Sequence, residues 1–229
     1  MQFNNTYVPD KSTNLLVITK NIYEIKKLTR VNTGLKYTNI RSKTRVISTS
    51  VIFSVLAIVL HPPFFPLAIP APYAPFLIYG LWEIPLVISL IIFGPLICII
   101  SAFINAMILY VFFPGSLPVG PLYNLIAIYG MMIGISMSYR IPHNNSIQKL
   151  LIIATIVAMI IRTVIMYFVN YIVLPMDFPL GFSIPVEQIP EILYLISIFN
   201  ITTALYTIPI AFIVSKSVAN RLNVKLWHS

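Results

Sequence analysis

Long apolar runs separated by short polar or proline-rich breaks dominate the sequence after residue 45. Within each run the apolar residues are continuous, whereas the strands of a transmembrane barrel would alternate apolar and polar positions. Continuous runs that approach about 20 residues predict helices that cross a membrane. We expect an all-α fold, a polytopic membrane protein with six transmembrane helices, over residues 46–60, 82–93, 95–113, 121–139, 150–174 and 191–217.

Two breaks in this pattern differ in kind. Segment 61–80 contains six prolines, several aromatic residues and no charge, so regular helix is excluded there. It predicts a long outer loop that lies on the membrane surface or covers a pocket. The second break is the Phe93-Gly94-Pro95 step, which is so short that the helices on either side form a hairpin.

The composition supports a membrane protein with a basic tail. Only 9% of the residues are charged, against about 25% in soluble domains. Nine of the 15 basic residues lie between Lys11 and Arg45. Basic residues favour the cytoplasmic side, which places both termini and loop 140–149 there and Glu83, Asp177, Glu187 and Glu191 outside. A net charge of +9 distributed in this way does not indicate a nucleic-acid partner.

Three regions follow from these patterns: a basic cytoplasmic tail over residues 1–45, a transmembrane domain over 46–218 and a short cytoplasmic tail over 219–229. The first 45 residues lack the apolar core of a signal peptide. Residues 14–28 form either part of a solvated tail or a short amphipathic helix on anionic headgroups.

Polar residues inside the apolar runs are candidates for a binding site. Arg162 at the centre of a span costs about 2.5–3.5 kcal/mol on insertion scales, so it should face the interior and be paired. Conversion of sequence position to depth predicts that the polar groups converge on the outer half of the bundle. They are Glu83, Asn105, Asn124, Arg162, Asn170 and Asn200. The alternatives are a structural salt bridge or snorkelling for Arg162, and helix-to-helix hydrogen bonds for the asparagines.

A stripe of small residues marks one face of the first predicted helix. Ser50, Ser54 and Ala57 lie at positions i, i+4 and i+7. Small residues allow close approach of another helix. The stripe therefore serves either packing within the bundle or docking onto a partner membrane protein.

Several signatures are absent from the sequence. There is no G-x-x-x-x-G-K-[ST] loop, H-E-x-x-H or G-x-S-x-G motif. The three histidines lie in separate loops or termini, which gives no expected metal site. We expect no enzyme activity, no catalytic residues and no cofactor, and interpret the chain as a small-molecule binder in the membrane that lacks its own source of energy.

Four segments of the sequence combine polar residues with proline, glycine or aromatic residues. They are W-E-I-P-L-V-I-S-L-I-I-F-G-P-L at residues 82–96, the turn L-P-V-G-P-L-Y-N, the N-Y pair at Asn170-Tyr171 and F-N at Phe199-Asn200. These segments resemble motifs of the substrate-binding S-components of energy-coupling factor (ECF) vitamin transporters, and most closely the riboflavin-specific branch. The first of them resembles the family's S-D-[LV]-P pattern that ends in G-P-L. Thr203 stands where the family has lysine, and Ile104 stands where it has lysine before Asn105.

The resemblance implies a subunit that captures a vitamin, with riboflavin the first candidate. It implies docking on a membrane coupling protein driven by two cytosolic ATPases, through Ser50, Ser54 and Ala57. In family terms the Pro-rich loop gates the pocket, where Tyr79 and Trp82 could stack on a flat ring. The full set of expected substrate contacts is Tyr79, Trp82, Glu83, Asn105, Asn124, Arg162, Asn170, Asn200 and Thr203.

Other functions are compatible with the same residues. One is an S-component for a different vitamin, and another is a self-sufficient facilitator of small-solute transport. A membrane scaffold or membrane enzyme is a third class, although an enzyme would gather more titratable residues in the pocket than Glu83 and Arg162.

Overall fold

The computed structural model describes residues 43–62, 64–65, 69–113, 115, 117–141, 147–222 and 226. The chain divides into two units, Met1–Ile47 and Ser48–Ser229. Of the first unit, only residues 43–47 are described, and they are helical. The predicted amphipathic helix at 14–28 and most of both predicted tails lie outside the described residues.

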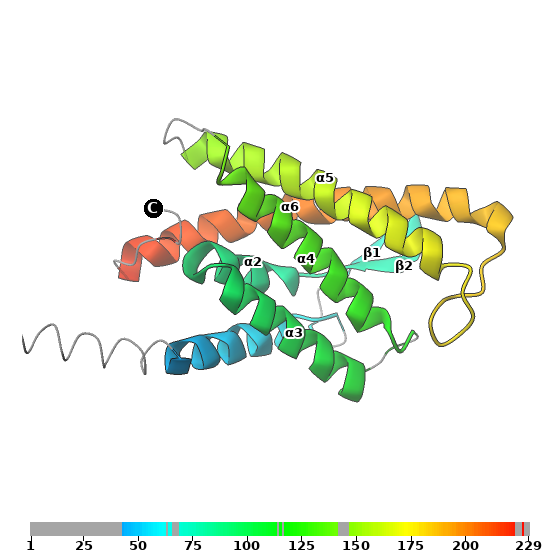
Figure 1. Ribbon diagram of the computed structural model, residues 1–229, viewed down its shortest axis with the longest axis horizontal. Helices are drawn as coiled ribbons and strands as arrows, with labels where there is room; N and C mark the ends of the chain where they lie inside the picture. Colours follow the sequence, from blue (N-terminus) through cyan, green and yellow to red (C-terminus); the bar gives the residue numbers. More distant parts are fainter. Residues whose placement is uncertain are drawn as a thin grey trace, which may run out of the picture. The chain divides into compact units, whose positions relative to one another are not determined.

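The second unit is mostly helical, as predicted (Figure 1). A helix described from residue 43 continues through residue 59. The helices that follow are α2 (Glu83–Phe93), α3 (Pro95–Phe112), α4 (Gly120–Ser138), α5 (Ile147–Val173) and α6 (Ile189–Leu222), with a short 3₁₀ turn, η1 (Val186–Gln188), before α6. Gly94 alone separates α2 from α3 and has φ 95°, in the left-handed region that favours glycine. Pro95 then begins α3, where the missing N–H of proline costs no helical hydrogen bond.

Four helical segments among the described residues are long and apolar enough to cross a membrane: Pro95–Phe112, Gly120–Ser138, Gln148–Val173 and Val186–Arg221. Helix α2 is apolar but has only 11 residues, a length of about 16 Å against a hydrocarbon core of about 30 Å. The structure therefore supports a multi-pass membrane protein, and the count of six spans stays a prediction.

Part of the proline-rich segment forms a β-hairpin, which the expectation of an irregular loop missed. Strands β1 (Ile69–Ala71) and β2 (Ala74–Tyr79) pair antiparallel, with Ile69 opposite Tyr79. A bulge interrupts the register between Pro70 and Ala71. Proline cannot donate to a ladder, but a two-stranded sheet has only edge strands, where proline is tolerated.

Glycine and alanine bring α4 and α5 close together. A Cβ built on Gly134 would lie 2.3 Å from Cα of Ala158, so only glycine fits at this crossing. One turn away, a Cβ on Gly130 would lie 3.4 Å from Cα of Arg162. Ala154, Ala158 and Arg162 follow one another at four-residue spacing on the same face of α5, and all three are buried. The close helix contact thus leads directly to Arg162.

The small-residue stripe of the first described helix packs inside this unit. Ser50, Ser54 and Ala57 are all at most 1% exposed. The hydroxyl of Ser54 donates towards the carbonyl of Ser101 on α3, at 2.9 Å, and towards the carbonyl of Ser50, at 2.7 Å. The stripe therefore packs within the bundle in this structure, and its docking onto a partner membrane protein stays a prediction.

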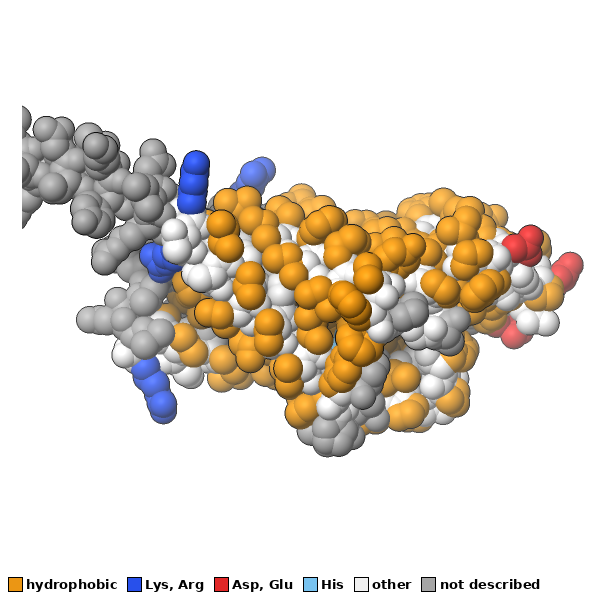
Figure 2. All heavy atoms as spheres, turned by 90° about the horizontal axis from the view of Figure 1, so that it is seen from below, with side chains coloured by type: hydrophobic (Ala, Val, Ile, Leu, Met, Phe, Trp, Pro, Cys, Tyr) orange, Lys and Arg blue, Asp and Glu red, His pale blue; other side chains and the backbone are white. Residues whose placement is uncertain are grey.

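Charged side chains gather at opposite ends of an apolar surface (Figure 2). Lys149 lies near the start of α5, and Lys216 and Arg221 lie near the end of α6. Asp177, Glu187 and Glu191 belong to the connection between these helices and the start of α6. This separation of charge is typical of a helix bundle that crosses a bilayer.

Candidate functional site: a buried ion-pair network

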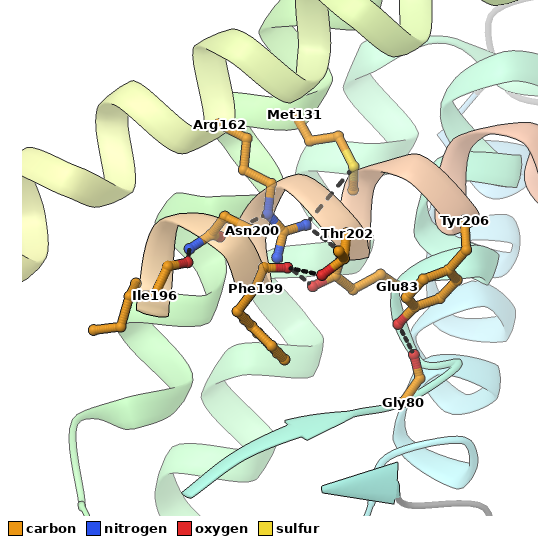
Figure 3. A network of polar contacts seen from close by, with 9 residues as sticks. All are labelled: Gly80, Glu83, Met131, Arg162, Ile196, Phe199, Asn200, Thr202 and Tyr206. Atoms are coloured by element: carbon orange, nitrogen blue, oxygen red, sulfur yellow. Dashed lines mark hydrogen bonds and ion pairs between the residues drawn. The ribbon is translucent and has the colours of Figure 1, made fainter. Parts of the chain in front are cut away.

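An arginine and a glutamate form a paired centre in the interior of the bundle (Figure 3). Arg162 projects from α5 and Glu83 from the first turn of α2, 79 positions away in sequence. Nη2 of Arg162 donates to Oε1 of Glu83 at 2.8 Å, and Nη1 contacts Oε2. The side chains are 2% and 4% exposed, so both charges are removed from solvent and depend on each other for stabilisation.

Helices α6 and α4 complete the network. Nε of Arg162 donates to Oδ1 of Asn200 on α6 at 2.9 Å. The amide of Asn200 donates in turn to the carbonyl of Ile196, also at 2.9 Å. Sulfur of Met131 on α4 lies 3.7 Å from Nη1 of Arg162. Four helices therefore meet at one guanidinium group, and both oxygens of the carboxylate are paired.

The β-hairpin is joined to α6 beside this network. The ring of Tyr79 stacks on Phe199 with centroids 4.8 Å apart, and its hydroxyl bonds Thr202 at 2.6 Å. The hydroxyl of Tyr206 donates to the carbonyl of Gly80 at 2.7 Å. Aromatic and hydroxyl contacts thus hold the end of the hairpin on the helix that carries Asn200, and Figure 3 shows the contact between Tyr206 and Gly80.

His61 and Trp82 form a second contact at the base of the hairpin segment. Their ring centroids are 5.4 Å apart, and Trp82 is buried. Burial lowers the pKa of His61 from 6.5 to about 4, so the imidazole is uncharged at neutral pH.

The structure brings only some of the predicted site residues together. Glu83, Arg162 and Asn200 form the network, and Tyr79 and Trp82 lie close to Glu83 in sequence on the segment that leads into α2. Asn124, in the first turn of α4, is exposed and makes no contact with the network that the structure records.

Three further predicted residues lie on the helices without joining the network. The amide of Asn170 donates along its own helix to Met166, at 2.7 Å. Asn105 and Thr203 are 3% and 2% exposed, and the Oδ1 of the first and the hydroxyl of the second have no hydrogen-bond partner. A buried acceptor or hydroxyl without a partner is energetically costly, so these two atoms are candidates to bond a ligand or water.

Several residues around the network were not among the expected substrate contacts. They are Gly130, Met131, Phe199, Thr202 and Tyr206. The small-xxx-small spacing of Gly130 and Gly134 was the available signal, because it predicts close helix packing. Nothing in the sequence distinguishes Met131 or Tyr206 from neighbouring apolar or aromatic residues.

The polar groups of this centre are engaged with one another. Among the described residues there is no group of three or more His, Cys, Asp or Glu side chains that could hold a metal ion. Glu83 is fully engaged by Arg162, which leaves no free base beside a nucleophile in the network.

Comparison with solved structures then gives a clear likeness. The chain is similar to the S component of a bacterial ECF transporter. The similarity has a TM-score of 0.64 at 25% sequence identity, and covers 79% of this chain and 98% of that S component. No protein-family model matches the sequence, and no curated protein matches it in a sequence search. The neighbour is a transporter component, and the likeness extends over nearly the whole of that component.

Proposed function

We propose that this chain is the substrate-capture S component of an ECF-type importer. The observation that carries the proposal is the structural likeness over 98% of a bacterial ECF S component. A buried polar centre shared by α2, α4, α5 and α6 supports it, because a membrane protein retains such groups in its interior for a structural or binding role. Energy for transport would come from partners: a membrane coupling protein and two cytosolic ATPases.

The proposed substrate is a vitamin or related micronutrient, with riboflavin first. The sequence resemblance at Asn170 and Asn200 supports riboflavin. Stacked rings at Tyr79 and Phe199 beside polar groups suit a flat aromatic ligand with hydrogen-bonding edges. Asn200 is already bonded to Arg162, so we assign direct ligand hydrogen bonds to Asn170, Thr203 and Asn105 and give Glu83 and Arg162 the role of holding the helices around the ligand.

The proposed topology places the basic end in the cytoplasm. The positive-inside tendency supports cytoplasmic termini, with Lys149, Lys216 and Arg221 on that side. The proposed six crossings require that the first described helix and α2, each with its neighbouring residues, also cross the membrane. The proposed contact with the coupling protein remains Ser50, Ser54 and Ala57, which are buried in this conformation and would be uncovered on docking.

Binding by the purified full-length protein tests the proposal. We expect a yellow, fluorescent ligand to co-purify, and riboflavin to bind in titration calorimetry. Asn170→Ala should weaken binding by about 1–3 kcal/mol, roughly 5- to 150-fold, through loss of a buried hydrogen bond. Asn220→Ala is the matched control, since Asn220 is exposed near the end of α6 and is not among the expected substrate contacts, and it should bind as the wild type does.

Other outcomes discriminate the alternatives. Binding of another vitamin but not of riboflavin would change the proposed substrate and retain the proposed S-component role. Uptake in a host that lacks every ECF ATPase and coupling subunit would reject the S-component role in favour of a facilitator. Equal losses in Asn170→Ala and Asn220→Ala would reject the proposed placement of the ligand.

A further inference from the structure

The connection between α5 and α6, residues 174–188, exposes more apolar surface than its length suggests. We call it the α5–α6 loop. Phe178 is 67% exposed, Leu180 52% and Phe182 53%. Met176 and Val186 are exposed as well. A contiguous set of exposed apolar side chains in a loop marks a surface that contacts something other than water.

These side chains are not exposed through lack of local order. The N–H of Ser183 donates to the carbonyl of Met176 at 2.8 Å, and that of Ile184 to the carbonyl of Leu174 at 3.0 Å. The hydroxyl of Tyr123 on α4 donates to the carbonyl of Leu180 at 2.7 Å. The backbone is thus closed on itself and tied to α4, and it presents the apolar side chains outward.

The interior of the same region is already filled. Leu174, Ile189, Leu193 and Ile196 form a buried cluster, and Leu77, Ile184 and Ile192 pack against it. The exposed Phe178, Leu180 and Phe182 take no part in that cluster. They are therefore additional to the core that stabilises this end of the bundle.

The position of the loop identifies its partner. On α6 the residues from 192 to 215 carry no charge, between Glu191 and Lys216. That stretch measures about 36 Å along the helix, close to the thickness of a hydrocarbon core crossed at a tilt. The loop lies next to the Glu191 end of this uncharged stretch. Figure 2 shows the acidic side chains gathered at one end of the apolar surface. Exposed Phe168, Tyr171 and Tyr194 flank it on α5 and α6, as aromatic residues do at headgroup level.

We propose that the α5–α6 loop inserts Phe178, Leu180 and Phe182 into the headgroup–acyl boundary of the leaflet at the acidic end, as an interfacial anchor. Its partner is a lipid surface without net negative charge, because the loop carries Asp177 and Glu187 and no lysine or arginine. The closed backbone allows insertion with little further loss of conformational entropy. This inference is independent of the proposed substrate and of the proposed transporter class.

Nitroxide labels on the full chain in phosphatidylcholine vesicles test the anchor. Single cysteines would replace Phe178, Phe182 and, as control, Glu187, in a Cys98→Ala background that removes the buried native thiol. We expect labels at 178 and 182 to collide with oxygen several-fold more, and with a water-soluble nickel chelate several-fold less, than the label at 187. Nickel accessibility at 178 and 182 equal to that at 187 would overturn the proposal. A loop that instead docks another protein would also show equal nickel accessibility at 178, 182 and 187, since no such protein is in the vesicles.

A further label position tests the anchor in case a labelled phenylalanine variant folds poorly. Leu180→Cys in the same background places the label between the two phenylalanines, on the loop tied to Tyr123. Shielding from nickel at 180 supports the anchor, and full accessibility at 180 contradicts it.

Discussion

Gly134 gives the sharpest test of how the helices are held together. An added Cβ would meet three atoms of Ala158: Cα at 2.3 Å, N at 2.8 Å and Cβ at 2.9 Å. Two of these are backbone atoms, so no side-chain rotation relieves the overlap. Gly134→Ala should force α4 and α5 apart by roughly 1 Å, at the cost typical of overpacking, about 1–3 kcal/mol.

Gly130→Ala is the matched control on the same helix. There the added Cβ meets the flexible end of Ile165 at 3.2 Å and Cα of Arg162 at 3.4 Å, which is near ordinary contact. Both substitutions gain the same helix propensity, up to about 1 kcal/mol, so that contribution cancels in the comparison. The difference between the two variants therefore isolates the close approach of α4 to α5.

Thermal unfolding of the purified chain in detergent measures this difference. A chain of this size should lose about 2–4 °C for each kcal/mol, so Gly134→Ala should unfold roughly 2–12 °C below Gly130→Ala. Adding Ala158→Gly should restore little, because Cα and N of residue 158 remain in place. Equal melting temperatures for the two glycine variants, or full rescue by Ala158→Gly, would refute the argument.

Three further predictions concern the rest of the bundle. Loss of one partner by Glu83→Met or Arg162→Met should each cost about 3–5 kcal/mol, because the other charge is left buried and unpaired. The double variant Glu83→Met with Arg162→Met should lie closer to the wild type than either single variant in a double-mutant cycle, and additive losses would contradict a coupled pair. Burial in the folded state lowers the pKa of His61 from 6.5 to about 4, so the folded state should lose up to about 3 kcal/mol of stability as the pH drops from 6.5 towards 4. His61→Gln should flatten this pH dependence in melting curves. An unchanged slope would show that other groups cause it. Ser54→Leu should lower the melting temperature of the isolated chain because Ser54 is buried against Ser101, while a residue that served only to dock a partner would leave it unchanged.

The helices were predictable because their physical signals are local. Continuous apolar runs require helix in a bilayer, and the Gly94-Pro95 step ends one helix and begins the next within a single residue. The predicted bounds of α2 and α3 each differ from the structure by one residue. The hairpin at 69–79 was not predictable in the same way, since its prolines weaken every local strand signal.

The site was predictable in composition and less so in geometry. The cost of burying Arg162 required a partner, and Glu83 was among the polar residues expected to converge with it. The rotation of each helix about its axis decides which polar groups meet, and that rotation is set by packing between distant segments. Asn124 therefore came out exposed and Asn200 paired, although both are asparagines in predicted spans.

The single-residue connection at Gly94 has a mechanical consequence. A longer loop would let α2 and α3 tilt separately, whereas one glycine followed by proline leaves almost no slack between them. A displacement of α3, whether caused by lipid or by a neighbouring protein, therefore also moves α2. Glu83 lies at the far end of α2 from Gly94, where such a movement is largest. The ion pair with Arg162 holds that end of α2 and therefore opposes such a movement.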